Sequence, residues 1–497
     1  MSTSTSDALE PIAGGRAPLD PARAVGELLA ATPVSVDLAR RFEAAGFSLA
    51  LVGGPVRDAL LGRLNDDLDF TTDARPEQVL KIGKGWADAV WDVGIAFGTV
   101  GFQKAGLKLE VTTYRTESYD RTSRKPEVAY GDTLEGDLVR RDFTVNAMAV
   151  LLHGETPPRG ELVDPHGGLA DLAAGVLRTP ATPEESFSDD PLRMMRAARF
   201  AAQLGFRVAP EVLAAMTAMA ERITIVSAER VQVELSKLLT APDPRAGLTL
   251  LVETGLAEYV LPELPKLSLE IDEHHRHKDV YEHSLTVLDQ AIALERGGPD
   301  LVLRLAALLH DIGKPRTRKF EPGGGVSFHH HDLVGAKMTK KRLRELKYSK
   351  EVVDDVARLV ELHLRFHGYG EGEWTDSAVR RYVRDAGPLL DRLHALTRSD
   401  CTTRNKRKAA TLAAAYDDLE VRIAKLQEQE ELDSIRPDLD GNQIMELLQI
   451  SPGQVVGRAY KFLMELRLDQ GPVGYDAAAS ALREWWADQP ESAAGSQ

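Results

Sequence analysis

Residues 49–62, "LALVGGPVRDALLG", and residues 64–70, "LNDDLDF", set the architecture of the first third of the chain. They predict an apolar strand, a pair of glycines, a helix that opens with proline, and a second strand. Side chains two positions apart in a strand share a face, so Asp67 and Asp69 should project together while Asp66 points away. The pattern therefore predicts an α/β unit with paired carboxylates on one face of a strand.

Paired carboxylates repel each other unless a cation lies between them, and Mg²⁺ is the ion that prefers oxygen ligands. A third acid, Glu110, lies between Leu109 and Val111 in "LKLEVTTY". Three carboxylates on two strands could hold the two ions of a phosphoryl or nucleotidyl transfer site. Taken alone, the aspartate pair is explained equally well by a charged surface strand.

The two glycines of the first stretch suggest where a phosphate would bind. Gly53 and Gly54 allow the backbone to approach a phosphate closely, and the helix that follows offers free N–H groups and a favourable dipole. Arg57 adds a cation one turn later. A lone glycine pair is a weak signal, but strand, double glycine, helix and Asp-x-Asp in this order form a specific pattern.

Composition narrows the class of protein. The 497 residues suggest about three or four domains, and 43% hydrophobic with 28% charged residues is typical of a folded protein. Cys401 is the only cysteine, no long uncharged apolar run occurs, and the first residues lack the pattern of a secretory signal. We therefore expect a cytoplasmic protein without a membrane anchor.

The net charge of −15 argues against a protein that coats nucleic acid indiscriminately. Local basic stretches still allow it to grip a folded RNA. These stretches are "YRTESYDRTSRK" (114–125), "KMTKKRLRELKYSK" (337–350) and "RNKRK" (404–408). Each of them alone is explained at least as well by a solvated helix or loop face.

The pattern along the chain predicts an α+β protein whose α/β head precedes mostly helical parts. We expect a mobile tail at 1–33, a head at 34–180, a helical neck at 181–267, a helical body at 268–430, a helical tail at 431–485 and a disordered end at 486–497.

Five motifs in order resemble the class II tRNA nucleotidyltransferases, the CCA-adding enzymes of the polymerase β superfamily, over residues 47–265. They are "GGPVRDALLG", "DDLDF", "VGIAFGTVGF", "RRDFTVNAMA" and "DDPLRMMRAARF". The resemblance implies a polymerase β-like head in which Asp67 and Asp69 bind Mg²⁺, with Glu110 as a third acid. It also implies nucleotide contacts from Gly54, Arg57 and Arg141, and a pocket for the sugar shaped by Asp142 and Asn146.

The last of these motifs suggests how bases are selected. Asp190 precedes a helix start, and Arg193, Arg196 and Arg199 follow at intervals of three. A carboxylate accepts from an exocyclic amine and an arginine donates to a ring nitrogen, so Asp190 and Arg193 could accept cytosine and adenine while refusing uracil and guanine. The resemblance implies the same selection, and Arg196 and Arg199 would contact base or phosphate.

A second constellation lies further along the chain. "LVLRLAALLHDIGK" ends an apolar helix in His310 and Asp311, with His283 upstream and Asp400 downstream. This order resembles the HD superfamily of metal-dependent phosphohydrolases over residues 275–405. Imidazole and carboxylate ligands suit a transition metal, and the histidines at 329–331 and His363 could complete a second metal position.

The HD segment could be an active phosphohydrolase or an RNA-binding body, and the sequence leaves both open. Residues 439–471 resemble the helical tail module of the same enzymes, which would touch the tRNA elbow.

The resulting hypothesis is addition of CCA to the 3′ end of tRNA from CTP and ATP, with release of diphosphate. Specialists that add only A or only C remain open. A poly(A) polymerase is disfavoured because those enzymes tend to carry a basic stretch where this chain has "VGIAFGTVGF". Alternatives from other classes are an HD phosphohydrolase that acts on RNA ends and a catalytically silent RNA-binding protein.

Overall fold

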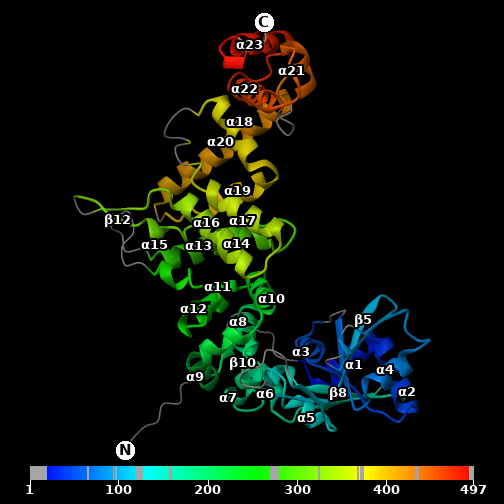
Figure 1. The fold of residues 1–497 in the computed structure, drawn as a ribbon. Helices are drawn as coiled ribbons and strands as arrows, with labels where there is room; N and C mark the ends of the chain where they lie inside the picture. Colours follow the sequence, from blue (N-terminus) through cyan, green and yellow to red (C-terminus); the bar gives the residue numbers. More distant parts are fainter. Residues whose placement is uncertain are drawn as a thin grey trace, which may run out of the picture. The chain divides into compact units, whose positions relative to one another are not determined.

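The chain folds into two compact units, residues 1–265 and 266–497, whose arrangement of a mixed sheet and many helices confirms the α+β class (Figure 1). The structure, a computed structural model, describes residues 19–63, 67–92, 94–95, 98–118, 127–155, 159–268, 279–322, 325–366, 369, 374–403, 405–430 and 436–491. Our predicted boundary between neck and body lay at 267/268, close to the division between the units.

The first unit contains the sheet. Its strands are β1 (Leu49–Val52), β2 (Asp67–Thr72), β3 (Ala89–Trp91), β4 (Thr99–Lys104), β5 (Leu107–Thr113), β6 (Arg115–Ser118), β7 (Glu127–Tyr130), β8 (Ala149–His153), β9 (Arg159–Val163), β10 (Val176–Leu177) and β11 (Arg207–Val208). Seven of them form one sheet in the order β3-β4-β5-β2-β1-β8-β9, while β6 pairs with β7 and β10 with β11.

The helices of the first unit cover this sheet and then continue alone as the neck. They are α1 (Pro21–Ala31), α2 (Pro33–Ala44), α3 (Gly54–Leu60), α4 (Pro76–Gly83), α5 (Leu134–Leu138), α6 (Gly168–Ala174), α7 (Pro183–Asp189), α8 (Leu192–Leu204), α9 (Pro210–Met219), α10 (Ala228–Leu239), α11 (Pro244–Glu253) and α12 (Ala257–Val260). Short 3₁₀ helices are η2 (Thr144–Asn146), η3 (Ala220–Ile225) and η4 (Pro265–Leu267).

Strand β1 is the centre of the head. All four of its residues are buried, as expected for a strand that is covered on both faces. It runs antiparallel to β2 and to β8, and Leu51 pairs with Phe70. The glycines that follow β1 therefore lie at the end of the sheet where β2 begins, which is where Asp67 and Asp69 are.

The expected N-terminal tail was wrong for its second half. Residues 21–31 form α1, which is capped by the Asp20 side chain and opens with proline. Leu28 and Leu29 are buried, and the helix packs against β9 and α3. The small residues of this segment suggested a loose tail, but alanine and leucine at helical spacing supply an apolar face. Residues 1–18 lie outside the described residues.

The second unit is helical apart from one short hairpin. Its helices are α13 (Val280–Leu294), α14 (Leu301–Leu309), α15 (Lys314–Thr317), α16 (His331–Glu345), α17 (Lys350–Leu362), α18 (Asp376–Ala386), α19 (Leu390–Ser399), α20 (Lys406–Glu430), α21 (Gly441–Leu448), α22 (Gln454–Gln470) and α23 (Tyr475–Ala487), with the 3₁₀ helix η5 (Gly387–Leu389). The hairpin pairs β12 (Lys319–Phe320) with β13 (Val326–Ser327).

Helix α14 is the core of this unit, because eight of its nine residues are buried. It packs against α13, α17 and α19. At the C-terminus α21, α22 and α23 enclose a separate apolar cluster around Leu439 and Leu482. Trp486 and Ala487 still belong to α23, so helix continues past residue 485, where we expected disorder. Within the described part of the chain, no helix combines the length and apolar character needed to cross a membrane.

Gly313 sets how closely α15 approaches α16. A Cβ atom at this position would lie 2.1 Å from the carbonyl oxygen of His331 and 2.8 Å from the backbone nitrogen of Gly335. Both neighbours are backbone atoms, which cannot rotate away as a side chain can. The absence of a side chain at Gly313 therefore allows Asp311 and His331 to come together from two helical segments.

We expect Gly313→Ala to destabilise the second unit by about 1–3 kcal/mol, because the added methyl group forces α15 and α16 apart. The measurement is the thermal unfolding of the full chain by calorimetry. Gly457→Ala is the matched control, since Gly457 is exposed within α22 and nothing lies within 4 Å of the added atom. Equal transition temperatures for the two variants would contradict the close approach.

Candidate functional site

Three carboxylates of the head lie on one face of the sheet. In β2 the side chains of Asp67 and Asp69 are exposed while Leu68 and Phe70 are buried, as predicted from their spacing. Strand β5 runs parallel to β2, and Asp69 pairs with Glu110, which is also exposed. Side chains of paired residues point to the same face, so Glu110 lies beside the aspartate pair. Asp66 lies outside the described residues.

The gathered acids change the titration of Asp69. Desolvation by the surrounding protein, together with repulsion from Glu110 and Asp67, raises the pKa of Asp69 to about 6, although Arg141 and Arg196 oppose the shift. A carboxyl group with two acidic neighbours is a natural ligand for a cation, which would relieve the repulsion. The donor set, three carboxylates and no nitrogen, fits a hard ion such as Mg²⁺.

A guanidinium group covers the glycine loop beside these acids. Gly53 has φ 74°, a conformation that favours glycine, and a Cβ atom there would lie 3.3 Å from Nη1 of Arg141. Arg141 is held by an ion pair of 3.0 Å with buried Asp137, and Asp137 also accepts a hydrogen bond from Thr71 of β2. The predicted phosphate contacts, glycine backbone and Arg141, are therefore side by side.

Four of the predicted nucleotide-site residues form one continuous chain of hydrogen bonds and ion pairs. Arg57 donates to Asn146 Oδ1 at 2.7 Å, Asn146 donates to Asp142 Oδ1 at 3.0 Å, and Arg196 pairs with Asp142 Oδ2 at 2.7 Å. Burial disfavours the charged form of Asp142, but Arg196 and the Asn146 amide outweigh it and hold its pKa below the usual range. This chain of contacts links α3, which follows β1, to η2 and α8.

Phe200 of α8 provides the surface against which these arginines pack. The guanidinium carbons of Arg57, Arg196 and Arg199 lie 5.3, 5.8 and 3.9 Å from its ring centroid. Arg199 also forms a buried ion pair of 2.6 Å with Glu234 of α10. In this structure Arg199 therefore stabilises the neck rather than lying open to a ligand.

The predicted base-reading pair is not in contact here. Among the described residues no hydrogen bond joins the side chains of Asp190 and Arg193. Arg193 instead donates to Ser186 Oγ at 2.9 Å and to the carbonyl oxygen of Arg140, while Asp190 pairs with Arg230 of α10 at 2.7 Å. The helical spacing placed both residues near the start of α8 but did not determine their partners.

Two residues beside the predicted sites were missed. Arg230 is distant in sequence, and no local pattern pointed to it. Lys108 pairs with Asp67 across β2 and β5 and is exposed on the same face as Glu110. Because side chains alternate between the two faces of a strand, the stretch "LKLE" already indicated that Lys108 shares a face with Glu110.

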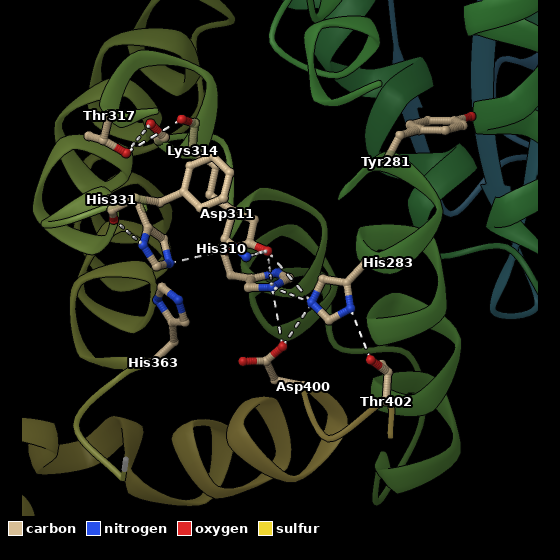
Figure 2. Close-up of polar contacts among 12 residues, drawn as sticks. Tyr281, His283, His310, Asp311, Lys314, Thr317, His331, His363, Asp400 and Thr402 are labelled. Atoms are coloured by element: carbon tan, nitrogen blue, oxygen red, sulfur yellow. Dashed lines mark hydrogen bonds and ion pairs between the residues drawn. The ribbon is translucent and has the colours of Figure 1, made fainter. Parts of the chain in front are cut away.

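The second constellation converges as predicted (Figure 2). Ring nitrogens and carboxylate oxygens of two groups lie within 4.8 Å of one another: His283, His310 and Asp400 form one group, and Asp311, His331 and His363 form the other. Asp311 joins them, since its Oδ2 lies 3.2 Å from His310 and its Oδ1 lies 3.2 Å from His331. We refer to these six residues as the HD cluster.

The histidines of the HD cluster are oriented by their other ring nitrogen. Nδ1 of His310, His331 and His363 lies 2.9, 2.8 and 2.6 Å from the backbone carbonyl three residues earlier. This contact requires a hydrogen on Nδ1, so Nε2 is the nitrogen left to bind a metal ion, as in metal-binding histidines. Nε2 of His363 is buried with no hydrogen-bond partner among the described residues. The cluster therefore fits a metal ion.

The pKa shifts in the HD cluster also favour a bound metal ion. Burial disfavours a charged His310, but Asp311 and Asp400 outweigh burial and raise its pKa to about 10. Burial and the neighbouring His310 lower the pKa of His363 to about 4. Two buried carboxylates thus demand a positive charge, while His363 stays neutral and able to ligate. Of the three successive histidines, His331 joins the cluster, and His329 and His330 are exposed.

Comparison with protein families divides the chain in the same way. Residues 49–178 match the model of the poly A polymerase head domain, and residues 205–267 match the model described as the probable RNA and SrmB-binding site of polymerase A. Residues 280–426 match the HD domain. The head model thus contains all three acids, and the HD model contains the whole HD cluster.

Related proteins and solved structures point to the same family as these domain models. The chain is 35% identical over 448 residues to the A-adding tRNA nucleotidyltransferase of Deinococcus radiodurans, covering 88% of this chain and 96% of that one. It is 44% identical to the CCA-adding enzyme of Levilactobacillus brevis, an alignment that spans 44% of this chain and only 52% of the relative. The structure of Bacillus stearothermophilus CCA-adding enzyme in complex with CTP superimposes with a TM-score of 0.64 and 25% identity, covering 91% of this chain and 97% of that one. The chain therefore belongs to the tRNA nucleotidyltransferase family that includes the CCA-adding enzymes, with a poly(A) polymerase-type head and an HD domain.

Proposed function

We propose that this enzyme adds C, C and A to the 3′ end of tRNA from CTP and ATP and releases diphosphate. The observation that carries the proposal is the parallel pairing of β2 and β5, which places Asp67, Asp69 and Glu110 on one face next to Gly53. The likeness to an enzyme crystallised with CTP supports the choice of nucleotide. We also propose that the protein works in a reducing compartment such as the cytoplasm, as expected from its single cysteine.

The residues have separable tasks. Asp67 and Asp69 would hold Mg²⁺, which when bound makes the tRNA 3′ hydroxyl a better nucleophile and neutralises the triphosphate. Arg141 and the glycine backbone bind phosphate oxygens, and buried Asp142 and Asn146 fix the position of the sugar. The hydroxyl attacks the α-phosphorus, and diphosphate leaves from the opposite side.

Base selection belongs to the start of α8. The carboxylate of Asp190 accepts from the exocyclic amine that cytosine and adenine share, and an arginine donates to the adjacent ring nitrogen. Arg193 can do this only by exchanging its contacts with Ser186 and the carbonyl of Arg140 for the base. Arg230, already paired with Asp190, orients the carboxylate for this contact.

A-addition alone is the second candidate for the same site, because the relative that matches over nearly the full chain is an A-adding enzyme. Incorporation of labelled nucleotides separates the two. A tRNA that lacks its whole terminus should gain two C residues and one A, whereas an A-adding specialist extends only a tRNA that already ends in CC. Use of UTP as readily as CTP would contradict base selection by Asp190.

We expect the double variant Asp67→Ala, Asp69→Ala to lose incorporation by at least about a thousandfold, because the ligands of the catalytic ion are gone. The same assay with Glu110→Gln should show a smaller loss if Glu110 is the auxiliary third acid. Asp88→Asn, at an exposed position beside Lys104 in the head, is the control and should keep full activity. Activity retained in the double variant would refute the metal assignment.

The raised pKa of Asp69 predicts a pH dependence. Because this pKa is about 6 rather than 3.8, Asp69 is charged at pH 7.5 and mostly protonated below pH 6, where it cannot bind a cation. The half-saturating Mg²⁺ concentration should rise about fourfold between pH 7.5 and 5.5.

Glu110→Gln tests the cause of this shift. It removes one repelling charge, so the rise in half-saturating Mg²⁺ should begin at lower pH in this variant, while Asp88→Asn follows the unmodified chain. Identical pH profiles for Glu110→Gln and the unmodified chain would show that Glu110 does not act on Asp69.

A second activity is favoured by the intact HD cluster. Six buried or half-buried ligands with anchored histidines suit a transition metal, and such a site can hydrolyse phosphoesters. We infer a metal-dependent phosphohydrolase that opens 2′,3′-cyclic phosphates to phosphomonoesters or hydrolyses terminal phosphomonoesters at RNA ends. Lys314, whose Nζ lies 2.9 Å from Asp311 Oδ2, is placed to meet the phosphate.

We expect His310→Ala to abolish metal-supplemented hydrolysis of a 2′,3′-cyclic nucleotide and to leave nucleotide incorporation unchanged. The double variant Asp67→Ala, Asp69→Ala should show the reverse pattern, so each variant is the control for the other. Metal content measured by atomic emission on the purified protein should fall in His310→Ala. Hydrolysis that survives in His310→Ala would place that activity outside the HD cluster.

A further inference from the structure

The segment that follows Asp311 is strongly basic, although the chain as a whole is acidic. Residues 312–320, "IGKPRTRKF", carry four cations and no acid, in a protein of net charge −15. We call residues 314–320 the basic arm. It comprises α15, Arg318 and strand β12, and Figure 1 shows β12 beside α15 at the edge of this unit.

Apart from Lys314, which pairs with Asp311, the cations of the basic arm are free of ion pairs within the described part of the chain. Among the described residues, no ion pair involves Arg316, Arg318 or Lys319, and Nε of Arg318 is buried without a hydrogen-bond partner. Elsewhere in this unit most arginines are paired with acids, as Arg392 is with Asp300 at 2.7 Å. Unpaired cations gathered on one segment create a local positive potential that suits a polyanion.

An exposed aromatic ring lies among these cations. Phe320 is 70% exposed, the highest value among the large hydrophobic residues of the described chain. The guanidinium carbon of Arg318 lies 4.7 Å from its ring centroid, so one face of the ring carries a cation and much of the rest is open. A flat ring backed by arginine is the arrangement on which unpaired nucleic acid bases stack.

The basic arm leads directly to the HD cluster. Its first residue, Lys314, contacts Asp311 (Figure 2). The Lys314 ammonium group also lies 5.6 Å from the ring centroid of Phe328. Phe320 lies nine positions after Asp311 in the chain, which limits the distance between them to roughly 32 Å. A single strand of several nucleotides could therefore stack on Phe320 and present its 3′ end to the cluster.

Helix α16, which packs against α15, extends the same basic character. Its exposed residues Lys337, Lys341 and Arg344 add positive charge. Glu321, the acid that follows the basic arm, accepts a hydrogen bond from Ser327 across the hairpin and so closes the hairpin rather than neutralising the arm. A phosphate backbone, with one charge per nucleotide, matches this distribution.

We propose that the basic arm is a binding site for single-stranded RNA, with a base stacked on Phe320, and that it delivers RNA 3′ ends to the HD cluster. The delivery step rests on the phosphohydrolase activity proposed above, whereas RNA binding by the arm does not.

The first experiment maps contacts directly. A single-stranded RNA of about 12 nucleotides with 4-thiouridine is cross-linked by light to the full chain in EDTA, and cross-linked peptides are identified. We expect a cross-link within residues 314–320 that falls about tenfold in Phe320→Ala, because the stacking surface is lost. Val421→Ala is the control, since Val421 is 54% exposed on α20 of the same unit. Cross-links confined to other segments would overturn the proposal.

The salt dependence of that cross-link tests the charges. Each of Arg316→Gln, Arg318→Gln and Lys319→Gln should lower the slope of log affinity against log salt by roughly 0.7, the value for one phosphate contact on a single strand. Lys425→Gln, at an exposed position on α20, should leave the slope unchanged. Unchanged slopes in all three arm variants would also overturn the proposal.

The delivery step is tested by substrate length. With RNA of about 12 nucleotides that ends in a 2′,3′-cyclic phosphate, Phe320→Ala should raise KM about tenfold at constant kcat. With the mononucleotide cyclic phosphate, both constants should stay unchanged. An equal effect on both substrates would refute delivery. Absence of hydrolysis in the unmodified chain would refute the phosphohydrolase, while the cross-link still decides RNA binding.

Discussion

The chain of contacts from Arg57 through Asn146 and Asp142 to Arg196 is the interaction on which the head depends. It joins three segments that are far apart in sequence: helix α3, the turn at η2 and helix α8. Asp142 and Arg57 are buried, so removal of one partner would leave an uncompensated charge in a region of low dielectric. The predicted nucleotide site is therefore held by the same contacts that attach the neck to the head.

The two predicted metal sites differ in how their clustered carboxylates are stabilised. In the head, Asp67, Asp69 and Glu110 lie together on one face of the sheet, and desolvation by the surrounding protein, together with repulsion from the other two acids, raises the pKa of Asp69. In the HD cluster the carboxylates Asp311 and Asp400 are held well below their usual pKa: burial opposes their charge, but neighbouring cationic groups and histidines outweigh it. An open set of oxygen ligands suits an exchangeable Mg²⁺ that arrives with a nucleotide, and a buried nitrogen-rich set suits a resident transition metal.

Sequence reasoning succeeded where one local geometric rule was enough. Alternation along a strand placed Asp67 and Asp69 on one face, and the order of the HD residues indicated one cluster. It failed where the partner was remote. No local pattern pointed to Arg230, which pairs with Asp190, and α1 packs onto β9 instead of forming a tail. Helical spacing shows which residues share a face of the helix, but it does not show which other segment packs against that face.

The sequence by itself determined which residues could share a face and so which ones we predict to carry the chemistry, because the motifs specify residue types at spacings that strands and helices translate into shared faces. Only the tertiary structure decided how those faces meet: the parallel register that sets Glu110 beside Asp69, the close approach at Gly313 that brings His331 to Asp311, and the exposure of Phe320 among unpaired cations. These features depend on contacts between segments far apart in the chain, and the free energies that select such contacts come from packing and burial of the whole domain rather than from any local run of residues.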